Sequence, residues 1–284
     1  MSTYAFRIVN VFAEAPLAGN PLCVFEDARG LDGATMQAIA LQFNLSETTF
    51  VLPSADADAE VRIFTPTFEM PFAGHPTLGS AHVVRSSRRT GDDVTLAMKA
   101  GRIPVHAAGD VWTLQANAPH QRTVDLPHDV LAGMLGLAPE DLAAGAAPLW
   151  VDTGSEQLVI PLASADAVRR AQPAAAMLAK HASNGQRAMA YVWAPTSPDD
   201  PSSLVARFFF PKHGAVIEDP GTGSACANLG GWLLATGAPL PLRRTIAQGD
   251  AVGRPCHLGL EVTRHGRILV SGRVIEIGRG TLDL

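Results

Sequence analysis

The sequence predicts an α+β fold composed of two similar halves. Three observations lead to this prediction. Short motifs recur about half a chain apart, each half runs from strands to a helix, more strands and a second helix, and the composition favours large buried surfaces. Of the 284 residues, 47% are hydrophobic and 17% are charged, against an average of about 25% charged in globular domains. The chain is long enough for one large or two medium domains.

The repeat consists of three motif pairs that occur in the same order in both halves. Their offsets are 145, 144 and 142 residues, close to half of the 284-residue chain. Each pair is weak alone, but a nearly constant offset is difficult to assign to chance. The pairs are "RIFTP" at 62–66 with "RFFFP" at 207–211, "GSA" at 79–81 with "GSA" at 223–225, and "FVLP" at 50–53 with "VWAP" at 192–195.

The first half contains a strand pair, a helix, further strands and a second helix. In the first helix, Met36, Ile39, Ala40 and Phe43 fall on one face, and Asp32 is placed to cap its N-terminus. Pro76 suits the first turn of the second helix, because its missing N–H is not needed there. The expected elements are strands over 6–14, 20–26, 47–52 and 60–66, helices over 32–44 and from Pro76, and a loop over 54–59.

The second half repeats this order with an interrupted helix. Pro173 breaks the helical pattern of residues 165–182. The other expected elements are strands over 148–154, 156–162, 188–195 and 204–211, a loop over 196–203, and a last helix within 218–237. We expect the seam within 115–127, which gives one half over 1–118 and the other over 119–284, with the last strand returning to pack on the first half.

Charge and composition disfavour several classes of protein. The formal net charge is −5 and the pI about 6.0, so binding of nucleic acid through a basic patch is not expected. No apolar run is long enough for a membrane span, and no signal peptide is visible. Cys23, Cys226 and Cys256 are scattered and odd in number, which is typical of reduced thiols in a cytoplasmic protein.

The starts of the two later helices are candidate binding positions. A buried helix N-terminus has N–H groups without partners inside the helix, and these suit a carboxylate or phosphate. His75 and Asp219 stand at these two starts. Because similar halves usually meet at a cleft, we expect both residues to line one ligand site. The alternatives are a hydrogen-bonded core histidine for His75, a helix N-cap for Asp219 and a packing role for Ser224.

Other chemistries lack their motifs. The sequence has no G-x-S-x-G, no G-K-[ST] after the glycines at 221–223, and no H-E-x-x-H. His75 and His82 are seven residues apart, which is not a spacing of metal ligands. The "GRGTL" segment at 278–282 follows a strand but opens no helix, so it is not a dinucleotide fingerprint.

Five segments carry a resemblance to a known family. The sequence resembles the phenazine biosynthesis PhzF-like family, whose members are related to diaminopimelate epimerase. The matching segments occur in the family's order and span nearly the whole chain. They are "GNPLCVF", "NLSETTFV", "MPFAGHPTLGSA", "EDPGTGSA" and "QGDAVGRP".

The resemblance implies a diaminopimelate epimerase-like fold, in which two halves are related by a pseudo-two-fold axis and each is a curved mixed sheet around a central helix. It implies a cofactor-independent isomerase without a metal. The partners that it implies are a small carboxylated substrate and a second copy of the chain in a homodimer. Glu47 would be the acid/base, flanked by the catalytic residues His75 and Asp219. The residues expected to bind the substrate are Asn20, Gly74, Thr77, Gly221, Thr222, Gly223 and Ser224.

The local sequence agrees with such a role for Glu47. In a strand over 47–52, Glu47, Thr49 and Val51 share one face. Apolar neighbours favour the neutral carboxyl, so its pKa would rise toward the operating pH. The alternative is a solvated glutamate at a strand end.

The related epimerases use two cysteines, one at each helix start. The matching positions here are Ala73 and Pro220, and Cys226 lies further into its helix, so a two-thiol racemase is disfavoured. Cys256 stands where relatives often have serine. The sequence favours proton transfer on a small carboxylated, cyclic or amino-acid-like metabolite. An epimerase that uses other residues and a non-catalytic metabolite-binding protein remain as alternatives.

Overall fold

The computed structural model describes residues 2–88 and 90–284. The chain forms two compact units. Unit 1 consists of Met1–Gln115 together with Ser271–Leu284, and unit 2 consists of Ala116–Val270. Each unit is described by itself.

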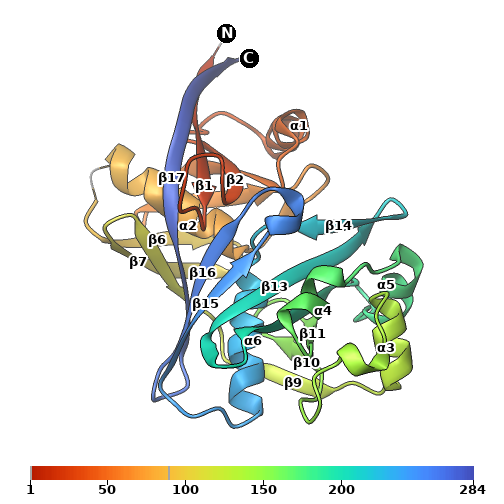
Figure 1. Cartoon of the computed structure of the whole chain (residues 1–284). Helices are drawn as coiled ribbons and strands as arrows, with labels where there is room; N and C mark the ends of the chain where they lie inside the picture. The colour runs from red at the N-terminus through yellow and green to blue at the C-terminus, as the bar shows by residue number, and fades with distance from the viewer. Residues whose placement is uncertain (1, 89) are drawn as a thin grey trace. The chain divides into compact units, whose positions relative to one another are not determined.

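Among its described residues, unit 1 contains two helices and the first eight strands. It is completed by the C-terminal part of β17, which lies beside β1 (Figure 1). Its elements are β1 (Thr3–Val11), β2 (Asn20–Phe25), α1 (Gly33–Phe43), β3 (Glu47–Leu52), β4 (Ala59–Phe64), β5 (Glu69–Met70), α2 (Gly74–Arg88), β6 (Asp93–Met98), β7 (Gly101–Ala108), β8 (Val111–Gln115) and β17 (Ile268–Asp283).

Unit 2 has the same kinds of element with more helix. They are β9 (His120–Thr123), α3 (His128–Met134), β10 (Leu149–Asp152), β11 (Gln157–Pro161), α4 (Ala165–Arg170), α5 (Ala175–His181), β12 (Ala190–Ser197), β13 (Asp200–Lys212), β14 (Ala215–Asp219), α6 (Gly223–Ala235), β15 (Leu242–Gln248) and β16 (Cys256–Val262). Two short 3₁₀ turns lie at Pro139–Asp141 and Asp250–Val252.

Strand pairing confirms that the two units have the same topology. In unit 1, β1 and β2 are antiparallel, β2 and β3 parallel, β3 and β4 antiparallel, and β4 pairs antiparallel with β5 and parallel with β6. In unit 2, β10 to β15 repeat these pairings in the same order and with the same directions. The motif repeat in the sequence therefore reflects one supersecondary pattern used twice.

Each unit is organised around one largely buried helix. Helix α2 contacts β1, β2, β3, β6 and β8, and α6 contacts β9, β10, β11 and β16. Small residues permit this close approach: a Cβ added to Gly79 would lie 2.6 Å from the Leu22 side chain, and one on Gly230 would lie 2.8 Å from Ile268. Small residues thus let both helices pack closely inside their sheets.

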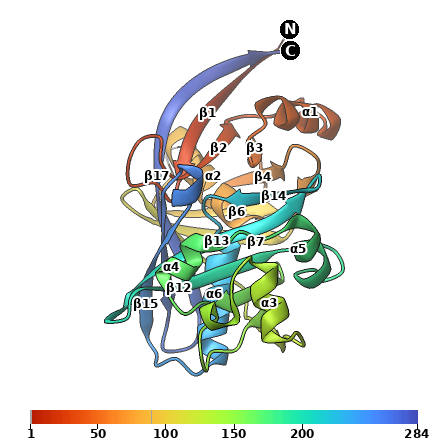
Figure 2. The same ribbon diagram turned by 45° about the vertical axis from the view of Figure 1, so that its right-hand side comes forward.

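The other helices cover the opposite faces of the strands. In unit 1, Phe25 and Phe50 pack with Met36 of α1. In unit 2, Val192 of β12 packs in a cluster with Val168 of α4, whereas the neighbouring Trp193 ring lies 5.1 Å from that of Trp232 in α6. Figure 2 shows α4 and α5 beside β12 and β13. The strands thus separate α6 from the shorter helices.

Most elements occur where the sequence predicts them, with one clear error. Asp32 caps α1 by accepting a hydrogen bond from the Thr35 N–H at 2.8 Å, and the helix around Pro173 is divided into α4 and α5. The loop expected over 196–203 is wrong, because β12 and β13 extend into it and Ser197 pairs with Asp200. Pro198 and Asp199 form the turn of this hairpin, and the flanking polar residues pair as strand.

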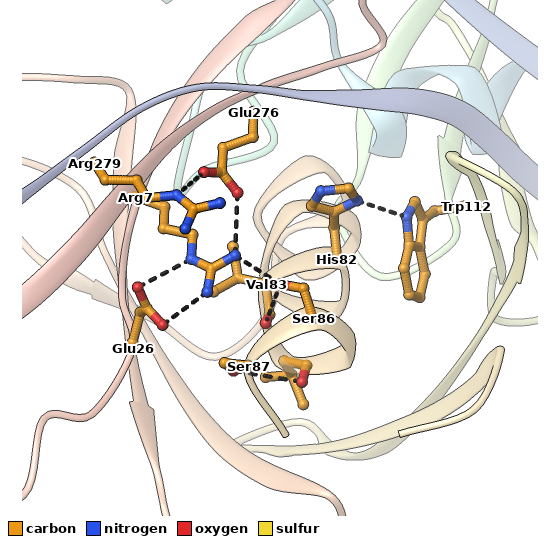
Figure 3. Close-up of polar contacts among 10 residues, drawn as sticks. Arg7, Glu26, His82, Val83, Ser86, Ser87, Trp112, Glu276 and Arg279 are labelled. Atoms are coloured by element: carbon orange, nitrogen blue, oxygen red, sulfur yellow. Dashed lines mark hydrogen bonds and ion pairs between the residues drawn. The ribbon is translucent and has the colours of Figure 1, made fainter. Parts of the chain in front are cut away.

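The last strand is bound into unit 1 by hydrogen bonds and charges. β17 pairs antiparallel with β1 from Thr3 to Val11. Arg7 of β1, whose side chain is 9% exposed, donates to both carboxylate oxygens of Glu26, to the Ser86 hydroxyl and to Glu276 of β17 (Figure 3). Unit 1 is therefore assembled from both ends of the chain. Within the described residues, no helix combines the length and apolarity of a membrane span.

Candidate active site

Glu47 begins β3 on the face that looks toward α2. Its backbone is paired with Leu22 of the parallel strand β2. Thr49, two residues further and on the same face, lies 2.9 Å from the Ser80 hydroxyl of α2. The Glu47 side chain is 15% exposed. The alternative of a solvated glutamate at a strand end is therefore wrong.

His75 is the second residue of α2 and is buried. Burial lowers its pKa to about 3, and a hydrogen bond to the Pro21 backbone acts weakly in the opposite direction. Because proline has no N–H, its carbonyl must accept a hydrogen bond from an imidazole N–H. The nitrogen that donates is Nδ1, since Nε2 has no hydrogen-bond partner among the described residues. His75 is thus a neutral imidazole with its Nε2 lone pair available.

The two side chains meet at these atoms. His75 Nε2 lies 3.5 Å from Glu47 Oε2, slightly longer than an ordinary hydrogen bond. A neutral Nε2 and an ionised carboxylate would face each other with lone pairs only, so the contact favours a proton between them. A protonated Glu47 can donate to His75, and catalytic hydrogen bonds are often long before substrate binds. The arrangement fits a carboxyl group that gains and loses one proton.

The other predicted residues of unit 1 lie beside this pair. Asn20 is fully buried and precedes Pro21, the partner of His75. Gly74 begins α2. Thr77 is also buried, but both its hydroxyl and its backbone N–H donate to the Ala73 carbonyl, at 2.7 and 3.2 Å. Thr77 therefore stabilises the first turn of α2 with both of its donors.

In unit 2, Asp219 and Thr222 form a closed turn before α6. Thr222 is the N-cap residue, and its hydroxyl donates to the Asp219 carboxylate. Gln248 of β15 fastens this turn, since its amide nitrogen lies 2.9 Å from the Asp219 carbonyl and 3.0 Å from the Thr222 hydroxyl. Asp219 is thus not the N-cap of α6, and that alternative is wrong.

Ser224 occupies the first turn of α6 and is partly exposed. Its hydroxyl oxygen accepts a hydrogen bond of 2.9 Å from the amide of Gln157. The neighbouring Gly221 and Gly223 are buried. The polar group at the start of this helix therefore consists of the hydrogen-bonded Asp219 and Thr222, followed along the chain by Ser224.

An arginine–glutamate pair holds the strand that leads into each central helix. Arg62 of β4 binds both carboxylate oxygens of Glu69, at 2.8 and 2.9 Å. Arg207 of β13 pairs in the same way with Glu218, with a closest distance of 2.7 Å. Each glutamate precedes the first residue of its helix by five positions. The repeated "RIFTP" and "RFFFP" motifs supply these arginines, a role that the motifs alone did not reveal.

The cysteines have the properties of packing residues. Burial raises the pKa of Cys226 and Cys256 far above the ordinary thiol value, with nearby Asp219 adding to the effect at Cys256. Neither thiol is thus prepared to act as a nucleophile or base. Across residues 2–88 and 90–284, no cluster of three or more His, Cys, Asp or Glu side chains is placed to hold a metal ion.

Comparison with known proteins identifies the family. The profile described as phenazine biosynthesis-like protein, PhzC-PhzF, matches residues 9–280. An uncharacterized isomerase from Pasteurella multocida is 40% identical, over 99% of this chain and 95% of the relative. The trans-2,3-dihydro-3-hydroxyanthranilate isomerase of Pseudomonas chlororaphis is 33% identical, over 98% and 99%.

The fold agrees with this assignment. The crystal structure of a PhzF-family phenazine biosynthesis protein from Bacillus anthracis superimposes with a TM-score of 0.90 over 100% of both chains, at 24% identity. The predicted fold class and the predicted resemblance are therefore confirmed. From the family match and its named relatives, the chain belongs to the PhzC-PhzF family of phenazine biosynthesis-like proteins and is an enzyme of the isomerase class.

Proposed function

We propose that this enzyme moves a proton on a small carboxylated metabolite, cyclic or amino-acid-like, with Glu47 as the acid/base and without a cofactor. The observation that supports the proposal best is the 3.5 Å contact between Glu47 Oε2 and Nε2 of a buried, neutral His75. Paired groups with unusual protonation are common at catalytic sites.

The division of roles follows from the protonation of the pair. With a pKa of about 3, His75 stays neutral across the physiological range and does not act as a cationic acid. Its Nδ1–H is held by the Pro21 carbonyl, so Nε2 is an acceptor that orients the Glu47 carboxyl when that group carries the proton. Glu47 is then the group that takes a proton from one substrate atom as a carboxylate and returns it to another as a carboxylic acid.

The substrate class rests on the relatives and on the polar group of unit 2. The relative from Pseudomonas chlororaphis carries the name trans-2,3-dihydro-3-hydroxyanthranilate isomerase, and that compound is a cyclic amino acid. We assign Asp219, Thr222 and Ser224 to substrate binding, because the N–H groups at the start of α6 and the Ser224 hydroxyl suit a carboxylate, whereas the Asp219 carboxylate suits an amino or hydroxyl group of the same substrate. This compound is therefore the first substrate to test.

A deuterium-exchange screen tests the activity. The full-length enzyme is incubated in D₂O with trans-2,3-dihydro-3-hydroxyanthranilate and a panel of carboxylated metabolites, and deuterium at carbon is measured by NMR. A shifted proton identifies an isomerase, and an inverted centre identifies an epimerase. Binding without any exchange would contradict the proposal.

Substitution of Glu47 tests its assignment as the acid/base. Glu47→Gln keeps the shape of the side chain but cannot accept a proton. We expect kcat to fall by about 10²–10⁴-fold with little change in ligand affinity. Glu60→Gln, at an exposed carboxylate of β4, is the matched control and should retain the parent rate. A Glu47→Gln enzyme as fast as the parent would show that the assigned base is wrong.

A further inference from the structure

A chain of buried polar side chains connects the residue after β10 with β11 and α6 and ends at Ser224. Thr153, Gln157 and Asn228 are 7%, 1% and 0% exposed. The Asn228 side-chain oxygen accepts from the backbone N–H of Thr153 at 2.9 Å and from its hydroxyl at 2.7 Å. The Asn228 nitrogen lies 2.9 Å from the Gln157 oxygen and 2.9 Å from the Ser155 carbonyl. We call these three residues the amide relay.

The relay has a fixed direction, because Asn228 contacts two backbone groups that have only one role each. The backbone N–H of Thr153 can only donate, so the Asn228 atom facing it must be the oxygen. The nitrogen of Asn228 then faces the Ser155 carbonyl, which can only accept, and the oxygen of Gln157. Gln157 must in turn present its NH₂ to Ser224, at 2.9 Å. The orientation of both amides follows from the network.

The hydrogen bond from Gln157 determines where the hydroxyl proton of Ser224 points. Since Gln157 donates to its oxygen, the hydroxyl proton cannot lie on that line and is directed to another acceptor. Asn228 follows Ser224 by one helical turn, so both lie on the same face of α6. The relay therefore fixes the hydroxyl that the proposed function assigns to the substrate.

The repeat supplies an internal comparison. Ser80 belongs to the "GSA" motif of α2 as Ser224 belongs to that of α6, but Ser80 is the seventh residue of its helix and Ser224 the second. Ser80 is fully buried, and its hydroxyl partner is the Thr49 hydroxyl at 2.9 Å. The serine of unit 1 is thus paired inside the protein, whereas that of unit 2 is partly exposed and receives its hydrogen bond from an amide.

We propose that Gln157 is a positioning residue that holds Ser224 as a hydrogen-bond donor to the carboxylate of the substrate. This inference rests on the proposed function, because it requires Ser224 to contact the substrate. Gln157 acts only through Ser224 and takes no part in the proton transfer itself.

Neutron diffraction tests the relay without any ligand. In crystals of the full-length protein grown in D₂O, we expect both deuterons of the Gln157 amide on the nitrogen near Ser224. The Ser224 deuteron should point away from that nitrogen. A Ser224 deuteron directed at Gln157, with the Gln157 oxygen facing it, would overturn the relay.

Substitution tests the effect on binding. In Gln157→Glu, one carboxylate oxygen still accepts from Asn228, but the other faces Ser224 in place of the NH₂ group. The Ser224 hydroxyl would then donate to residue 157 and could no longer donate to the ligand. We expect affinity for 3-hydroxyanthranilate, the aromatic counterpart of the first substrate, to fall about 10–100-fold by calorimetry. Gln37→Glu is the matched control, since Gln37 donates only to the Thr65 carbonyl at 2.8 Å and should bind as the parent does.

A double variant separates positioning from structural damage. Ser224→Ala should lose a similar factor, and adding Gln157→Glu to it should cost little more, because both changes remove the same hydrogen bond. Full additivity would overturn the inference, as would equal affinities in the parent and Gln157→Glu.

If Gln157→Glu does not fold, the neutron measurement decides. Binding that depends on Gln157 in an enzyme without turnover would overturn the proposed function and leave this inference standing.

Discussion

At the scale of single residues, the site depends on partners that act through the backbone. Glu47 and His75 were found because they lie in family motifs, and the structure brings them to 3.5 Å. Pro21, which fixes the His75 tautomer, was missed as a partner because its contribution is a carbonyl that every residue possesses. Gln157 was missed because it meets Ser224 only after two distant segments come together. Such relations depend on tertiary contacts and leave no local pattern in the sequence.

The buried His75 predicts a specific dependence of stability on pH. Its pKa is about 3 in the folded protein and about 6.5 in the unfolded chain, so the unfolded state binds the extra proton between these values. The stabilisation is complete above pH 6.5 and is lost as the pH falls. Between pH 7 and pH 5, His75 should reduce the free energy of unfolding by about 2 kcal/mol.

Urea denaturation of His75→Asn at both pH values measures this contribution. Asparagine does not titrate, and its amide N–H can replace the donor to the Pro21 carbonyl. Burial also lowers the pKa of His82, but that effect is common to both proteins and cancels in their difference. The same loss between pH 7 and pH 5 in parent and variant would contradict the assignment of His75 as a neutral imidazole.

At the scale of elements, the two helix starts are held by equivalent ion pairs. The Arg207 and Glu218 side chains are only 14% and 8% exposed, and Arg207 also donates to the Val168, Arg169 and Ala171 carbonyls that end α4. Its guanidinium lies 4.7 Å from the Phe209 ring. This one side chain therefore joins β13, β14 and the end of α4.

Replacement of Arg207 should lower the free energy of unfolding strongly. Arg207→Met would leave the Glu218 carboxylate buried and unpaired, and we expect a loss of about 3–5 kcal/mol in the free energy of unfolding, measured in urea. Arg207→Met combined with Glu218→Leu should recover part of this loss, because the double variant leaves no buried carboxylate without its arginine. A single variant that loses less than about 1 kcal/mol would show that the pair does not hold these elements together.

Elements with strong local signals were predicted best. Helix α1 has an aspartate cap and a one-sided apolar face, and β3 has a compact run of β-branched and aromatic residues. The hairpin over 196–203 was predicted as a loop because its residues are polar. Its pairing comes from extension of β12 and β13, with Asp200 accepting from the Ser202 backbone N–H at 2.9 Å. Such strand ends are set by their neighbours in the sheet.

At the scale of the whole molecule, unit 1 is not contiguous in sequence. The residues that complete it, 271–284, are the last of the chain, and β1 pairs with them along its full length. Leu282 packs against the apolar cluster that contains Phe25 and Met36. Glu276 binds Arg7 at 3.1 Å. A fragment that ends at Gln115 would expose one edge of β1 and lose these contacts.

The hydrogen bonds at the chain ends show how unit 1 can be made continuous. The Ser2 N–H donates to the Leu284 carbonyl at 2.7 Å, and the Leu284 N–H donates to the Ser2 carbonyl at 3.0 Å. Residues that exchange two such bonds are the pair that a two-residue hairpin closes, and Asn-Gly is the preferred connection. A chain of residues 271–284, Asn-Gly and residues 2–115 should therefore fold with one cooperative urea transition, whereas residues 2–115 alone should not. Val274→Asp in the rearranged chain, at a side chain that is 1% exposed, is the control and should abolish that transition. Equal cooperativity and equal midpoints for the rearranged chain and for residues 2–115 would show that the C-terminal strand is dispensable for unit 1.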